Sequence, residues 1–214
     1  MESNTNIILK ALEQMLDAKR FAHTLAVCEA AVVLAERFGA DKNKAYLAAL
    51  LHDCARGLNE EQLRAYCFEY GIRLDDYMRN DINPVHALVG ADIAERRFGI
   101  IDESILSEIR NHATGSENMA FLDKIILVAD AIESNRTGSD ADEARQSAEN
   151  DLDEAIVPAM RVKTYYLKGK PMRPSSVRML KRLEDTKEIR SLYFNWVKRI
   201  CAEKNICVIA IMVI

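Results

Sequence analysis

The sequence predicts an all-α protein, built as a single helical bundle with a short C-terminal extension. Glycine and proline, which mark turns, make up only 8 and 4 of the 214 residues, so short loops are expected between helices. Apolar residues recur at helical spacing along most of the chain. The two-residue alternation of a β-strand is absent, except as one interpretation of the terminal residues 207–214.

Helix boundaries follow from the residues at their ends. Asp41 and Asp102 stand where an N-cap is expected, and Asn83-Pro84 has the form of an N-cap followed by proline at the first helical position. Ser175 or Ser176 would cap the last helix. The expected helices cover residues 5–18, 19–38, 41–54, 60–70, 83–98, 102–112, 118–133, about 146–167 and about 175–204. Residues 72–81 and 169–175 are expected to be loops.

The length suits one domain, expected over residues 1–200, followed by an apolar tail at 201–214. This tail is too short to span a bilayer, and the polar N-terminus does not resemble a secretory signal. An edge strand, a contact in a homodimer and a disordered end all remain open as its role. We therefore expect no membrane partner.

Charge and cysteine usage narrow the function class. The net charge is −4 and the pI about 5.7, which argues against a protein that binds nucleic acid through its phosphate backbone. The five cysteines form no CxxC pair. Small buried thiols in a reducing, cytoplasmic compartment are the expected interpretation.

The chain has only four histidines, and each falls on a separate expected helix: His23, His52, His86 and His112. Asp53 follows the second of them directly, and Asp130 lies on the expected helix 118–133. Helical spacing places all six side chains on the faces that carry apolar residues. We therefore expect them to point into the interior of the bundle.

Buried aspartates need a partner, because removing a lone charge from water is costly. No lysine or arginine lies beside Asp53 or Asp130 on the same helical face. A divalent metal held by imidazole and carboxylate would satisfy the acids and the histidines together. Taken singly, each histidine could be a hydrogen-bonded core residue and each aspartate a helix cap or an ion-pair partner. To replace the metal site, this alternative would have to hold independently for all four histidines and both aspartates, which weakens it.

Several segments carry a resemblance to a known family. The order His23, His52-Asp53, Asp130 on helices resembles the HD superfamily of metal-dependent phosphohydrolases, and the YqeK-type branch in particular. The similar segments are Arg20–Val27, Leu50–Arg56, Val85–Ala91, Asn111–Gly115 and Met119–Arg136. The resemblance covers roughly residues 15–170, and it implies an all-α HD-type domain.

The resemblance implies an enzyme, a symmetrical bis(5′-nucleosyl)-tetraphosphatase that cuts diadenosine tetraphosphate into two ADP. It also implies two divalent metal ions, commonly iron, although the same ligands suit manganese, cobalt, nickel or zinc. His23, His52, Asp53 and Asp130 would hold one ion. His86 and His112 would hold the second, with Asp53 bridging. A hydroxide bound to the metals would attack an inner phosphorus.

Phosphate transfer also needs positive groups that neutralise charge. Arg20 lies one turn before His23, and Arg56 lies four residues after His52. We expect both arginines to contact phosphate, and Arg136 to be a further candidate. The hydroxyl groups of Thr24 and Thr114 could bond phosphate oxygens, or else their own backbone.

Four positions depart from the pattern of the branch, and they bear on substrate preference. Arg56 stands in place of a lysine, Ala113 of a threonine, Ala131 of an aromatic residue and Ser134 of a proline. Two other functions stay open at this point. One is an HD phosphohydrolase acting on a nucleoside mono- or triphosphate, a guanosine polyphosphate or a cyclic nucleotide. The other is a helical regulatory module without catalysis.

Overall fold

The computed structural model describes residues 2–164 and 172–186, and within these ranges the regular structure is entirely helical. The all-α expectation is therefore confirmed. The helices are α1 (Glu2–Met15), α2 (Ala18–Arg37), α3 (Lys42–Leu51), α4 (Glu60–Glu69), α5 (Asp76–Asn80), α6 (Val85–Phe98), α7 (Glu103–Asn111), α8 (Phe121–Ile132), α9 (Ser139–Ser147) and α10 (Leu152–Thr164). Residues 174–186 form a further helical segment.

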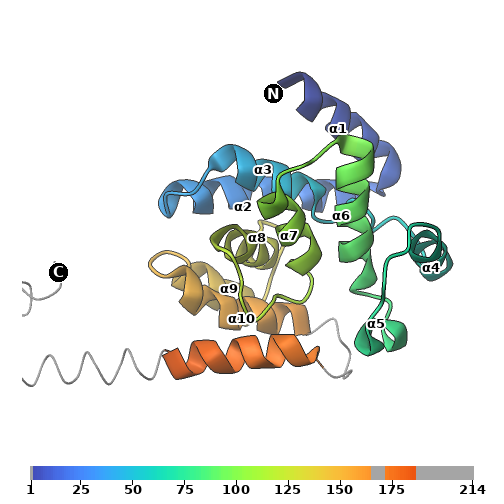
Figure 1. Ribbon diagram of the computed structural model, residues 1–214. Coiled ribbons are helices and arrows are strands. Elements are labelled where there is room, and N and C mark those ends of the chain that lie inside the picture. Colours follow the sequence, from blue (N-terminus) through green and yellow to red (C-terminus); the bar gives the residue numbers. More distant parts are fainter. Residues whose placement is uncertain (1, 165–171, 187–214) are drawn as a thin grey trace, which may run out of the picture.

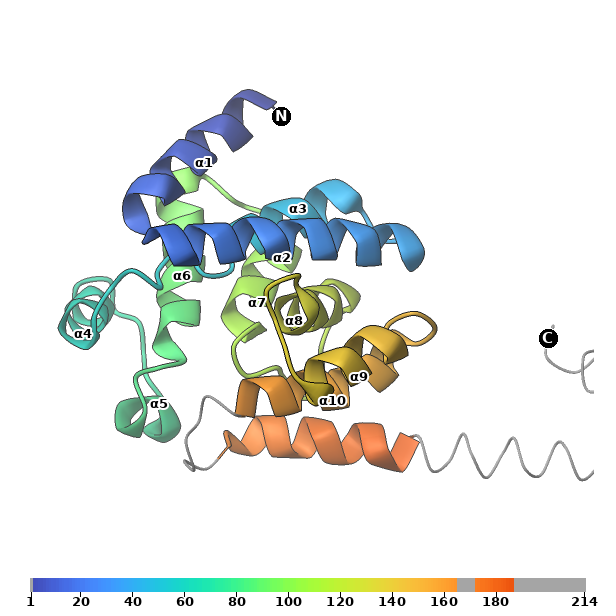
Figure 2. The same ribbon diagram turned by 180° about the vertical axis from the view of Figure 1, so that it is seen from behind.

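Helix α8 lies at the centre of the bundle (Figures 1 and 2). It packs against α2, α3, α7, α9 and α10. Its residues Ile125–Ala131 are all buried, because this stretch is apolar on every side except at Asp130. Helices α4 and α5 lie at the edge of the molecule beside α6 (Figure 1). The segment 174–186 runs along α10 in both views.

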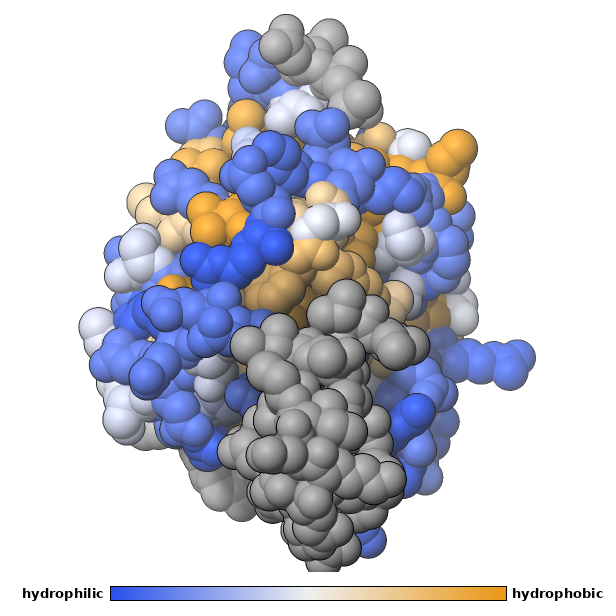
Figure 3. Space-filling view, turned by 90° about the vertical axis from the view of Figure 1, so that its left-hand side faces the viewer, coloured by the Kyte–Doolittle hydropathy of each residue, from blue (hydrophilic) through white to orange (hydrophobic). Residues whose placement is uncertain are grey.

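One cluster of buried apolar residues runs from Ile8 in α1 to Met179 in the segment 174–186. Figure 3 shows a face of the molecule on which most side chains are hydrophilic, with apolar ones gathered in the middle. This distribution is typical of amphipathic helices around a shared core. No helix in the described part of the chain is long and apolar enough to cross a membrane.

The two expected aspartate caps are confirmed. The Asp41 carboxylate accepts hydrogen bonds from the main chain at residues 43 and 44, and Asp102 accepts one from Ser104. The expected Asn83 cap is wrong. Helix α6 begins at Val85, and no side chain caps it. The side-chain oxygen of Asn83 instead accepts a hydrogen bond of 2.7 Å from Arg56.

Two further boundaries differ from expectation. The stretch 72–81 contains the short helix α5, which Asp75 caps through a hydrogen bond from Met78 N. The helix expected over about 146–167 begins later, at Leu152, and a separate helix, α9, covers residues 139–147, most of which were not expected to be helical. Asp151 then starts α10 by accepting from the main chain at residues 153 and 154. Local polar caps therefore override the longer periodic pattern.

The last helical segment begins at residue 174, slightly before the expected caps. Ser176 does not cap it. Its hydroxyl donates a hydrogen bond of 2.7 Å to the carbonyl oxygen of Thr114. This bond ties the segment to the loop after α7. The expected continuation of this helix to residue 204 and the tail at 201–214 lie outside the described residues.

Candidate metal centre

The structure brings the six candidate ligands together at one end of α8. His23 comes from the second turn of α2 and Asp130 from the last turn of α8, and the His23 Nε2 atom lies 3.2 Å from Asp130 Oδ1. Asp53 Oδ1 lies 3.2 Å from His86 Nε2 and 3.3 Å from His112 Nε2. The convergence expected from helical spacing is thus present.

The ligand atoms form two groups that meet in the middle. Those of His23, His52 and Asp130 lie within 4.8 Å of one another, and so do those of His52, Asp53 and His112. His52 is fully buried, and its Nε2 atom has no hydrogen-bond partner. Asp53 presents Oδ2 toward His52 at 3.8 Å and Oδ1 toward the other two imidazoles. Its carboxylate therefore lies between the two sides of the cluster.

Every imidazole in the cluster is held through its Nδ1 atom by an oxygen. In His52, His86 and His112, this atom lies 2.5–2.8 Å from the main-chain carbonyl oxygen three residues earlier. In His23 it lies 3.2 Å from Glu133 Oε1. With the proton on Nδ1, each ring would donate to its oxygen and present Nε2 to the centre of the cluster as a possible metal ligand.

This arrangement favours a cation at the centre. The Nε2 atoms of His86 and His112 are 3.1 Å apart, and both face the ionisable oxygens of Asp53. Lone pairs at such distances repel unless a positive charge lies between them. Protonated imidazoles would be a poor source of this positive charge, because burial lowers the pKa of His52 and His86 and lowers that of His112 to about 3. The donor set fits a divalent metal ion.

The two carboxylates are ionised at neutral pH. Burial acts to raise the pKa of Asp53, yet the surrounding imidazoles hold it well below its ordinary value. Burial acts likewise on Asp130, but Lys163, the hydrogen bond with His23 and then Arg136 hold the pKa of Asp130 well below its ordinary value. Both acids can therefore serve as anionic ligands.

The three expected phosphate contacts surround the cluster. Arg20 Nη1 donates to Asp53 Oδ2 at 3.2 Å. Arg136 Nη2 donates to Asp130 Oδ1 at 2.7 Å. Arg56 bonds to Asn83, and its Nε atom lies 3.6 Å from Asp53 Oδ1. The expectation that no basic residue lies beside Asp53 in its own segment is therefore wrong, because Arg56 follows it by three residues. All three arginines lie close enough to meet a phosphate chain bound at the cluster.

The two threonines are placed differently from each other. Thr24 is fully buried inside the bundle, and its hydroxyl has no hydrogen-bond partner within the described ranges 2–164 and 172–186. Since it does not line the cavities at the site, its position argues against contact with substrate. Thr114 lines the cavity over the cluster, but its hydroxyl donates to the carbonyl oxygen of Gly115. Of the two interpretations of Thr114, the structure favours local bonding to the backbone.

Sequence reasoning missed two residues of the site, Glu133 and Lys163. Glu133 lies three residues after Asp130, so its helical spacing could have placed it beside that acid. Lys163 pairs with Asp130 Oδ2 from the end of α10. No local signal could have found Lys163, because 33 residues separate the two partners and the break between α9 and α10 was not expected.

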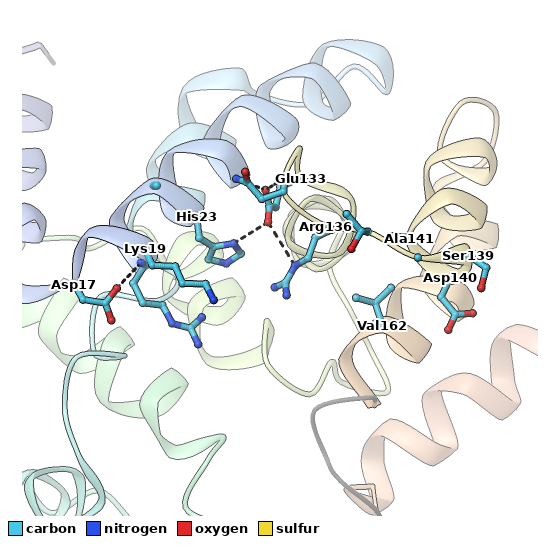
Figure 4. Close-up of a pocket in the computed structure, with 14 residues that line it drawn as sticks. Asp17, Lys19, His23, Glu133, Arg136, Ser139, Asp140, Ala141 and Val162 are labelled. Atoms are coloured by element: carbon cyan, nitrogen blue, oxygen red, sulfur yellow. Dashed lines mark hydrogen bonds and ion pairs between the residues drawn. The ribbon is translucent and has the colours of Figure 1, made fainter.

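Two cavities meet at the cluster. The smaller, about 90 Å³, is lined by Asp53, His86, His112, Asp130 and all three arginines. The larger, about 870 Å³, is lined by residues of α2, the loop after α8 and α9. Figure 4 shows His23, Glu133 and Arg136 together at this larger pocket. Arg20 and Arg136 line both cavities, so they mark the junction between the two.

Comparison with known proteins places the chain in a family. The family model described as HD domain matches residues 20–135, a range that contains all six candidate ligands. The "Bis(5′-nucleosyl)-tetraphosphatase, symmetrical" of Bacillus subtilis strain 168 is 37% identical over 81% of this chain and 94% of its own length. The protein of the same name from Halalkalibacterium halodurans is 36% identical over the same shares of each chain.

A solved structure of an HD superfamily protein is also similar to this chain. The crystal structure of an HD superfamily hydrolase from Clostridium acetobutylicum, described as involved in NAD metabolism, is 34% identical and aligns with a TM-score of 0.79. The alignment covers 85% of this chain and 97% of that one. The HD domain and the buried histidine and aspartate groups together indicate that the protein binds divalent metal. With its family model matched over more than half of its length, the chain belongs to the HD domain family.

Proposed function

We propose that this protein is a symmetrical bis(5′-nucleosyl)-tetraphosphatase that hydrolyses diadenosine tetraphosphate to two ADP. One observation carries the proposal. Six candidate ligand side chains converge where two cavities meet, in a chain that aligns over 81% of its length with two enzymes of that name.

We assign two divalent ions to the cluster. His23, His52 and Asp130 would hold one, and His86 and His112 the other, with Asp53 bridging. The two oxygens of Asp53 support this assignment, because Oδ2 faces His52 while Oδ1 faces the other pair. Iron is the metal that the resemblance to the family implies. The ligand set would also accept manganese, cobalt, nickel or zinc.

Bound divalent ions would activate water and neutralise phosphate charge. The chain would do the rest by positioning the substrate. The larger pocket would take one nucleoside, and Arg20 and Arg136 at its junction with the smaller cavity would hold the phosphates. Arg56 and Lys163 line the smaller cavity and would balance charge there. Water would add to one inner phosphorus, the bridging P–O bond on its far side would break, and ADP would leave.

The proposal is tested by product identification. Purified protein reconstituted with iron or manganese is incubated with diadenosine tetraphosphate, a nucleoside triphosphate, a guanosine polyphosphate and a cyclic nucleotide, and the products are separated by chromatography. We expect two ADP per tetraphosphate consumed. Formation of ATP plus AMP, or turnover of another substrate without turnover of the tetraphosphate, would refute the proposal.

The metal assignment is tested by Asp53→Asn, which keeps the size of the side chain but removes its charge. Loss of a bridging ligand should weaken metal binding by more than about 100-fold, since even groups outside the ligand shell contribute 10- to 100-fold. Asp102→Asn, a helix cap distant from the site, is the control. Undiminished metal content in the Asp53 variant, measured by elemental analysis, would contradict the bridging role.

A further inference from the structure

We propose that Glu133 is a positioning residue that holds His23 for metal binding, and so sets the affinity of one metal ion and not of the other. The inference rests on the proposed two-metal site. It concerns a side chain that contacts a candidate ligand rather than the metal itself.

Glu133 lies where α8 ends, three residues after Asp130. It is only 3% exposed, and its Oε1 atom accepts a hydrogen bond from His23 Nδ1 at 3.2 Å. On the other side of the same ring, Nε2 lies 3.2 Å from Asp130 Oδ1. The end of α8 therefore contacts both nitrogens of the His23 imidazole. Figure 4 shows His23 directed at Glu133.

His23 differs from the other three histidines in how it is held. The imidazoles of His52, His86 and His112 bond to carbonyl oxygens of their own local backbone. No substitution of another side chain can remove those bonds. His23 depends on a carboxylate 110 residues away in the sequence. It is therefore the one candidate histidine ligand whose orientation rests on a second side chain.

Glu133 is itself held rigidly. Its Oε2 atom accepts hydrogen bonds from the main chain and the side chain of Asn135, at 2.6 and 3.1 Å. Its carbonyl oxygen accepts one of 3.0 Å from Arg145. With Oε2 engaged, Oε1 is directed at His23 and at Arg136, whose Nε atom lies 3.7 Å away. The orientation of the imidazole is thus set before a metal binds, which reduces the cost of ordering it.

The charge of Glu133 should matter as well as its position. A carboxylate that accepts from Nδ1–H fixes the tautomer in which Nε2 is free to bind metal, and it makes that nitrogen a stronger donor. A backbone carbonyl does the same more weakly, because it carries no net charge. Removing the charge at Glu133 should therefore weaken the metal bound by His23.

The test uses Glu133→Gln, which keeps an oxygen acceptor and loses the charge. The full chain is stripped with chelator and titrated with Mn²⁺ by calorimetry. We expect the wild type to bind two ions, and the variant to bind one of them about 10- to 100-fold more weakly with the other unchanged. Asp123→Asn is the matched control, because it removes a buried carboxylate from the same helix without touching the cluster. It should bind both ions as the wild type does.

A double-mutant cycle separates positioning from a structural role. If Glu133 acts through His23, then Glu133→Gln should weaken Mn²⁺ binding no further in a His23→Ala background. Additive losses would refute the proposal, and so would two unweakened ions in the single variant. A Glu133→Gln chain that fails to fold while His23→Ala folds would also refute it. A wild type that binds no Mn²⁺ would instead remove the metal centre, and both proposals with it.

Discussion

At the scale of the residue, Glu108 in α7 is a carboxyl group whose burial costs free energy in its charged form. Its side chain is fully buried, and neither carboxylate oxygen has a hydrogen-bond partner among the described residues. Burial raises the pKa of Glu108 well above its ordinary value, and the nearby Asp123 raises it further. The group is therefore expected to stay protonated in the folded protein at pH values where the unfolded chain has lost the proton.

This predicts a stability that depends on pH through Glu108. Its contribution is fully present below the unfolded pKa of about 4.5 and is lost as the pH rises toward the folded pKa. Glu108→Gln should gain stability relative to the wild type as the pH rises above 4.5, by up to about 1.4 kcal/mol for each pH unit. Urea unfolding of the metal-free protein between pH 5 and 8, which lies above the unfolded pKa, measures the difference.

Glu103→Gln is the control, because this residue lies on the same helix, is exposed and pairs with Arg110. It should leave the pH dependence unchanged. If stability changes with pH in the same way in the wild type and in the Glu108 variant, the pKa of Glu108 does not differ between the folded and unfolded protein, which would contradict the prediction.

The sequence allowed the convergence of the six candidate ligands to be predicted at this scale, and the structure confirms it. For His23, His86 and Asp130, which lie within helices, the direction of the side chain follows from helical geometry. His52 and His112 instead lie at the C-caps of α3 and α7, and Asp53 lies in the turn that follows α3. Lys163 could not be predicted, since its contact with Asp130 depends on how α10 packs against α8. The burial of Thr24 was missed for a related reason. Its position beside His23 in the sequence does not specify that it faces a neighbouring helix.

At the scale of the element, the two helix starts at Asp41 and Asp102 were predicted correctly, because each aspartate supplies the cap directly before an apolar helical pattern. The predicted cap at Asn83 is wrong, because its side-chain oxygen accepts a hydrogen bond from Arg56, which is distant in the sequence, and not from the start of α6. Prediction also failed at the break before α10. There the capping aspartate, Asp151, lies inside a stretch whose periodicity is continuous.

The turn after α3 has little room for a larger side chain at Gly57. A shift of this turn would also affect the site, because the turn carries both Asp53 and Arg56. A Cβ atom at Gly57 would lie 2.1 Å from the Met15 carbonyl oxygen, whereas one at Gly90 would lie 3.4 Å from Cys54 Sγ. We expect Gly57→Ala to cost about 1–3 kcal/mol by overpacking and to lower activity by shifting the turn. Gly90→Ala lies inside a helix and should be neutral or stabilising by up to about 1 kcal/mol.

Denaturant unfolding and turnover of diadenosine tetraphosphate measure this pair of variants. Equal stability in the two would mean that the contact between the turn and the end of α1 is easily relieved. Loss of activity in the Gly57 variant without any loss of metal would locate the damage at Arg56 rather than at Asp53.

At the scale of the whole molecule, the metal centre connects distant parts of the chain. The candidate ligands come from α2, α6, α8, the C-cap of α7 and the residues directly after α3. A metal that binds only the folded chain stabilises it by about 2.7 kcal/mol when free metal is at 100 times its dissociation constant. For a chain of this size that corresponds to a rise in melting temperature of about 5–10 °C.

Chelation should therefore lower the melting temperature by that amount, and differential scanning calorimetry with and without EDTA would measure it. Asp53→Asn, which should hold little metal, ought to melt at the same temperature in both conditions. A wild type indifferent to chelator would show that metal binding does not contribute to holding these elements together.

Most of the candidate ligands sit at helix ends. His52 and His112 are the C-caps of α3 and α7, and His86 is the second residue of α6. Inserting one amino acid within α7 would rotate everything after it by about 100° about the helix axis and swing the His112 ring away from its neighbours. These helices can therefore change by replacement of residues, whereas an insertion or deletion inside one of them would displace a candidate ligand at its end.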